Sequence, residues 1–183
     1  MKNATAGLQR FNFVRIGDAH AVARDRVALE LDANQPSSAR RRFREAIGRY
    51  EALSVTETSE PHWRAVLADA WALAAEADYA RGAADASRDA MDKALQARIR
   101  LAARHPEEAW ALAGMWRLRA ALRAALGDAQ VATESLQQAR ALAESLCLRS
   151  KGADAPVRFV IHTLLDQADH ALRTGDLNQA REA

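Results

Sequence analysis

The chain lacks the features that mark several classes of protein. Its 183 residues include a single cysteine, Cys147, so an intramolecular disulfide cannot form and a reducing cytoplasm is the simplest location. Its hydrophobic runs stay short of the ~20 residues that cross a bilayer, and no apolar segment precedes a cleavage-like site near the N-terminus. A glycine-rich phosphate loop is also missing. We therefore expect a cytoplasmic protein that does not insert into membranes and needs no cofactor.

Aromatic residues are scarce as well, and the net charge is small. Aromatic side chains make up 5% of the chain while alanine is abundant, which favours a core of closely approaching helices. The apolar fraction of 49% and the charged fraction of 27% are typical of a folded chain rather than a disordered one. A net charge of +2 gives little attraction to a polyanion, so the composition does not favour nucleic acid as a partner.

Four breaks recur at nearly even spacing in an otherwise helical pattern. Asn34, Gly82, Gly127 and Gly175 each separate one stretch rich in Ala, Leu and Arg from the next, at spacings of 48, 45 and 48 residues. Glycine relaxes a tight turn between two helices because it carries no Cβ. The even spacing predicts an all-α protein built from an array of antiparallel helix hairpins.

The breaks divide the chain into a loosely structured N-terminal segment, 1–16, and a helical repeat domain, 17–183. The repeat units are expected at approximately 17–54, 60–104, 106–150 and 155–183, the last incomplete. The first helix of the last unit has an apolar line that is the counterpart of the buried stripes before it: Val160, Ile161, Leu164, Leu165, Ala168 and Leu172. Because a terminal repeat needs a polar cap, we expect the native chain to continue past Ala183.

The residues around the breaks resemble the tetratricopeptide repeat family, in its bacterial variant with longer helices. Trp71 and Trp116 stand where the family has a large residue, eleven residues before the turn glycine. The family's small residue of the first helix is matched by Ala75, Ala120 and Ala168. Its small, large, small series after the turn is matched by Ala39/Phe43/Ala46, Ser87/Met91/Ala94 and Ala132/Leu136/Ala139. The chain departs from the family at Asp78 and Arg123, which replace a tyrosine, and in a period longer than about 34 residues.

This resemblance implies a right-handed α-solenoid that acts as a non-catalytic protein interaction scaffold. In that family the first helices of successive pairs line a concave groove, which holds an extended peptide or a helix of a partner protein. The corresponding positions here are Arg24, Asp69, Glu76, Tyr79, Arg117, His162, Asp169 and Arg173. Their mixed charges favour a protein segment over a uniformly anionic polymer. The alternative for each residue is a solvated side chain, or one paired within the chain.

A run of arginines from Arg40 to Arg44 resembles a phosphate or nucleic-acid patch. On a helix, however, Phe43 faces inward while the arginines spread over more than half of the circumference, and Glu45 and Glu51 follow. This pattern favours a solvated, salt-bridged face over a binding site for nucleic acid.

His162, Asp166 and His170 lie at i, i+4 and i+8, which places two imidazoles and a carboxylate on one helical face. Such spacing is able to seed a metal site. The sequence offers no second group of ligands beside it, so surface or capping roles are favoured. A metal-dependent enzyme is therefore the most distant of the alternatives.

Two classes of function remain at the level of the sequence. The first is a protein-binding scaffold, serving as one module of a larger bacterial regulatory or assembly protein, and the register of the repeats favours it. The second is a self-associating structural helical domain, such as a homodimer. Its motivation is the uncapped C-terminal end together with the alanine-rich helical faces.

Overall fold

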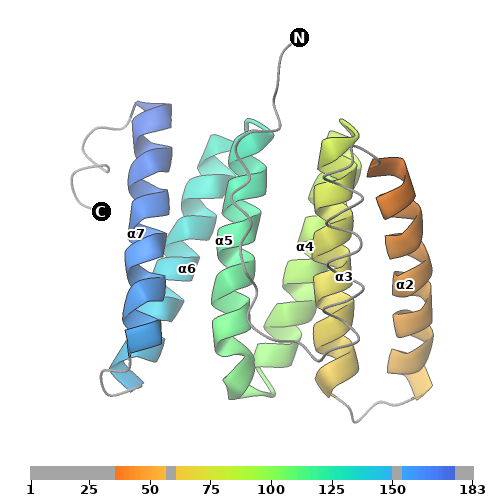
Figure 1. The fold of residues 1–183 in the computed structure, drawn as a ribbon. Helices are drawn as coiled ribbons and strands as arrows, with labels where there is room; N and C mark the ends of the chain where they lie inside the picture. Colours follow the sequence, from red (N-terminus) through yellow and green to blue (C-terminus); the bar gives the residue numbers. More distant parts are fainter. Residues whose placement is uncertain (1–35, 57–60, 150–153, 176–183) are drawn as a thin grey trace. The chain divides into compact units, whose positions relative to one another are not determined.

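The computed structural model describes residues 36–56, 61–149 and 154–175, and this part of the chain is made of α-helices with one short 3-10 turn (Figure 1). The expected all-α class is confirmed, since no strand occurs within the described ranges. Arg24, Asn34 and the predicted segment 1–16 lie outside the described residues, as does the start of the last predicted helix at 176–183. The stacking of the hairpins into a right-handed solenoid stays a prediction.

The chain divides into two compact units, with the boundary between Arg104 and His105. The described helices of the first unit are α2 (Pro36–Thr56), α3 (Pro61–Ala80) and α4 (Ala84–Ala102). Those of the second are η1 (Pro106–Glu108), α5 (Ala109–Ala125), α6 (Ala129–Arg149) and α7 (Asp154–Thr174). Within the first unit α3 packs against both α2 and α4, and within the second α6 packs against both α5 and α7. The predicted repeat boundaries themselves stay a prediction.

Glycine turns join the helices of each hairpin. Gly82 follows α3 with a φ of 76° and Gly127 follows α5 with a φ of 84°, both in the left-handed region. At the first turn the Gly82 amide donates to the Tyr79 carbonyl at 2.9 Å, and the Ala83 amide donates to the Asp78 carbonyl at 2.9 Å. This pair of bonds satisfies carbonyls that the end of the helix leaves without a partner, and it allows the chain to reverse direction within a few residues.

The same turn recurs in the second unit. The Gly127 amide donates to the Ala124 carbonyl at 3.1 Å, and the Asp128 amide donates to the Arg123 carbonyl at 2.8 Å. Gly175, after α7, also has a positive φ of 78°. The three glycines that break the helical pattern in the sequence are therefore the residues that end helices in the structure.

Small side chains line the contact between α3 and its neighbours. Ala68, Ala74, Ala75 and Ala77 are fully buried on α3. The Ser87 hydroxyl of α4, also fully buried, donates to the Ala75 carbonyl at 2.8 Å, so the two helices approach closely enough for a side chain to reach the neighbouring backbone. Larger side chains fill the rest of the core of this unit, among them Val66, Met91 and Leu101.

The second unit follows the same plan. Ala113 and Ala120 of α5 are buried, as are Ala132, Ala139 and Ala143 of α6. Met115 and Leu122 supply the volume that alanine lacks, and both are fully buried. Because alanine loses no side-chain rotamers on folding, such a core favours helix formation while it brings the helix axes together.

Replacing Gly127 with alanine should lower the free energy of unfolding by about 1–2 kcal/mol, because a Cβ is disfavoured at positive φ. Gly48 is the matched control. It lies exposed within α2, and at both glycines an added Cβ meets no atom of the described residues within 4 Å. Gly48→Ala should therefore raise stability by roughly 0.5–1 kcal/mol. Urea unfolding of the two variants measures both effects, and changes of the same sign would contradict the assignment of the turn.

Candidate functional site

Charged side chains buried between helices are the first polar feature of the molecule. Asp78 of α3 is fully buried, and it accepts from Arg40 Nε of α2 at 2.7 Å and from Arg81 Nη2 at 2.7 Å. The Asp78 carboxylate thus joins α3 to α2, because its partner Arg40 is 38 residues away in the sequence. Asp78 stands where the tetratricopeptide pattern has a tyrosine, so this departure from the pattern coincides with an ion pair between helices.

A second buried ion pair joins α3 to α4. Arg98 of α4 is 2% exposed, and it donates to the Asp69 carboxylate and, at 3.1 Å, to the Ala65 carbonyl. Asp69 was predicted to line a partner groove. In the structure its carboxylate contacts a guanidinium of its own hairpin, so a partner would have to compete with this pair.

The predicted groove residue Arg117 is also held within its unit. Its Nε and Nη2 donate to Asp166 Oδ2 of α7 at 2.8 Å and 2.6 Å, and its guanidinium lies 5.1 Å from the centre of the Phe159 ring. The Phe159 ring meets Trp110 edge to face at 5.5 Å between centroids. Arg117 is therefore buried between α5 and α7 and joins these two helices.

The three residues of the possible metal-binding face have different surroundings. His170 is buried, and its Nε2 lies 3.0 Å from the Ala129 carbonyl and 3.0 Å from the Thr133 hydroxyl oxygen. A carbonyl only accepts, so Nε2 carries the proton in this tautomer. Asp166 pairs with Arg117, and His162 is exposed to solvent. Across the described helices, no group of three or more His, Cys, Asp or Glu side chains is placed to hold a metal ion.

Glu76 and Tyr79, two further predicted groove residues on α3, are half-buried. Burial raises the pKa of the Glu76 carboxyl to about 7, because a carboxylate loses hydration there. This side chain therefore takes up a proton near neutral pH, a property that the helical pattern of the sequence does not reveal.

The remaining predicted groove residues share the outer side of α7. His162, Asp169 and Arg173 are all exposed, and Arg173 Nη2 pairs with Asp169 Oδ2 at 2.8 Å. An exposed pair of this kind contributes little to stability. These three side chains are thus accessible on one helix, although their role in binding stays a prediction.

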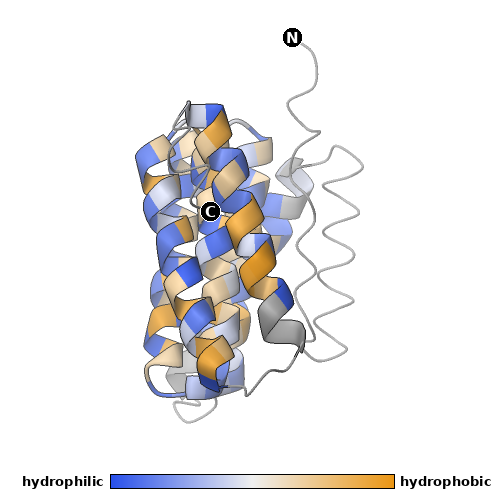
Figure 2. Ribbon diagram, turned by 90° about the vertical axis from the view of Figure 1, so that its left-hand side faces the viewer, coloured by the Kyte–Doolittle hydropathy of each residue, from blue (hydrophilic) through white to orange (hydrophobic). Residues whose placement is uncertain are grey.

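The apolar line predicted on α7 is only partly covered, since three of its six residues are exposed. Ile161 is 49% exposed, Leu165 59% and Leu172 61%, and Leu148 at the end of α6 is 85% exposed. Figure 2 looks onto this side, where hydrophobic segments recur along α7. We call Ile161, Leu165, Ala168 and Leu172 the α7 seam. Helical periodicity identified these residues as one stripe, but it could not show whether a neighbour covers the stripe.

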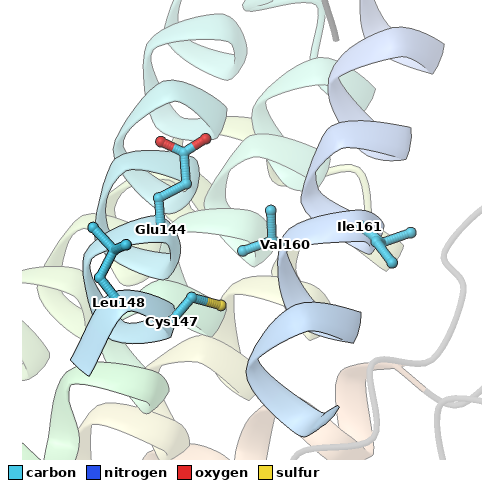
Figure 3. A pocket seen from close by; sticks show the side chains of 5 residues that line it. All are labelled: Glu144, Cys147, Leu148, Val160 and Ile161. Atoms are coloured by element: carbon cyan, nitrogen blue, oxygen red, sulfur yellow. The ribbon is translucent and has the colours of Figure 1, made fainter. Parts of the chain in front are cut away.

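A hollow of about 500 Å³ lies between α6 and α7, next to the seam. Its lining is mostly apolar and comprises Glu144, Cys147, Leu148, Val160 and Ile161. In Figure 3 Val160 points from α7 towards α6, while Ile161 points away from α6. Leu148 and Ile161, the first residue of the seam, therefore border the same hollow within the second unit.

Comparisons with known proteins do not assign this chain to a family. No family model matches it, and no curated protein matches it. Among the described helices, none is both long enough and apolar enough to cross a membrane.

Replacing Asp78 with alanine should lower the free energy of unfolding by roughly 3–5 kcal/mol, because it leaves the Arg40 guanidinium buried without its carboxylate. Asp85→Ala is the matched control, since Asp85 is fully exposed in its pair with Arg88 and should contribute little to stability. Chemical denaturation measures both variants. Equal effects of the two substitutions would show that the buried pair does not hold α2 to α3.

The raised pKa of Glu76 predicts that stability falls as the pH rises from about 4.5 to about 7. In this window the folded chain keeps a proton that the unfolded chain has already lost. Glu76→Gln should remove this loss, with a gain on the order of 1–2 kcal/mol above pH 7 and little gain below pH 4.5. Unfolding measured across this range tests it, with Glu45→Gln at an exposed position of α2 as the control. A Glu76→Gln difference that does not grow with pH would contradict the prediction.

Proposed function

We propose that this chain is a non-catalytic protein interaction module that binds an α-helix of another polypeptide. The observation that carries the proposal is the α7 seam of the second unit, whose three large apolar side chains are exposed along one helix. Large apolar side chains that gather on one face of a soluble protein commonly mark a binding surface, because covering them releases ordered water. A helix with its own apolar stripe is the partner whose shape suits a straight line of this kind.

The surroundings of the seam support a protein partner. His162, Asp169 and Arg173 lie beside it, so both charge signs are within reach of a bound helix. Mixed charges around an apolar centre give orientation and specificity in protein interfaces. Three of the groove residues proposed from the tetratricopeptide resemblance therefore lie next to the exposed seam.

The use of charged residues elsewhere supports a non-catalytic role. Asp78, Arg98, Arg117 and His170 each contact a neighbouring helix through a hydrogen bond or an ion pair. Of these, Arg117 and His170 lie in the second unit, where they join α7 to α5 and to α6 and so help to hold the outer face of α7 in a fixed shape. A rigid surface binds with less loss of conformational entropy than a mobile one.

A photo-crosslinking amino acid at position 165, introduced in cells, should give a crosslinked polypeptide on irradiation. The same probe at Gln137, which is exposed on α6, is the matched control for surface position. Leu165→Glu in a chain carrying the probe at Leu172 should remove the crosslink, because a carboxylate would be desolvated in the interface. Mass spectrometry of the product identifies the polypeptide. A yield at position 165 no higher than at position 137 would contradict the proposed function.

A further inference from the structure

We propose that the polypeptide that covers the α7 seam is a second copy of this chain, whose own α7 packs antiparallel on it across a two-fold axis. This inference rests on the proposed function, because it names the occupant of the same apolar surface.

The seam has the spacing of a surface that pairs with another helix. From Ile161 the steps to Leu165, Ala168 and Leu172 are four, three and four residues, which is the alternation of a heptad core. These positions span about 17 Å along the helix at the usual rise per residue. Three of the four carry large apolar side chains that are about half exposed or more. The line is thus suited to contact a second helix that runs nearly parallel or antiparallel to α7.

Side-chain size favours the antiparallel direction. With the two-fold axis midway along the seam, Leu165 meets Ala168 of the second copy, and Ile161 meets Leu172 of the second copy. Every large residue near the centre then faces a small one, so the helices approach closely without a void. A parallel pair would place Ala168 opposite Ala168 and leave a gap beside two leucines.

Charge complementarity points the same way. His162 and Asp169 both flank the seam on the side that faces solvent, seven residues apart. In the antiparallel pair these flanking positions approach each other, so His162 lies beside Asp169 of the second copy at both ends of the seam. Asp169 keeps the capacity for this contact, since its pair with Arg173 is exposed and weak.

The hollow lies where one end of α7 of the second copy would pack. Ile161 lines it together with Cys147, Leu148 and Val160, and its lining is mostly apolar. Leu172 of the second copy, which meets Ile161, would lie at the edge of this hollow. The two-fold axis repeats this contact at the other end. The seam alone is short, so we expect a weak, reversible dimer at the low end of interface sizes.

Sedimentation of the full chain over a wide concentration range tests the inference. The weight-average mass should rise from that of one chain towards that of two as the concentration increases. Leu165→Glu should weaken dimerisation at least about tenfold, and Gln137→Glu on α6 should leave it unchanged. Because Leu165 is exposed, the variant is expected to fold, which circular dichroism checks. A monomer at every concentration, or a dimer that Leu165→Glu leaves intact, would overturn the proposal.

A charge exchange tests the antiparallel direction. His162→Glu places a carboxylate beside Asp169 of the second copy, and Asp169→Lys places a cation beside its His162, so each single change should weaken dimerisation. The double variant places opposite charges at both ends and should recover most of the loss. Losses that simply add in the double variant would overturn this register. If the chain is monomeric while position 165 crosslinks to a different protein, the self-association fails and the proposed function stands.

Discussion

Close approach of alanine-lined helices is the constraint on which the rest of the structure depends. Ala74, Ala75 and Ala77 of α3 are fully buried, and Ser87 of α4 reaches the backbone of α3. Alanine buries little apolar area per residue, so the contact between two helices gains less from the hydrophobic effect than a leucine-rich contact would. The hairpins therefore combine a thin apolar contact with specific polar bonds between helices.

The polar bonds between helices account for many of the charged residues that the sequence presents. Asp78, Arg98 and Arg117 are almost completely buried, each against a charge or a carbonyl from another helix. A buried charge is tolerated only when it is paired, so these residues make an alternative packing of the helices costly. In contrast, the outer side of α7 keeps its charges exposed and its large apolar side chains uncovered. This difference separates the residues that build the hairpins from those available to a partner.

The turns could be predicted from the sequence, whereas the ion pairs and the exposed seam could not. Gly82, Gly127 and Gly175 interrupt a helical pattern, and a glycine at a helix end has a local physical cause that needs no knowledge of the fold. For Asp69 and Arg117 the sequence left both a groove position and pairing within the chain open, because their partners are 29 and 49 residues away. Periodicity placed the seam residues on one helical face, but it reports which residues share a face and not what lies opposite that face.

The glycine turns also bear on how fast the chain reaches its structure. Because Gly82 and Gly127 reverse the chain within a few residues, most contacts inside the hairpins α3–α4 and α5–α6 join segments that are near neighbours in sequence. Closing so short a loop costs little entropy, and proteins dominated by such local contacts cross their folding barrier quickly. Each hairpin is thus able to form early during synthesis, before the rest of the chain has emerged from the ribosome.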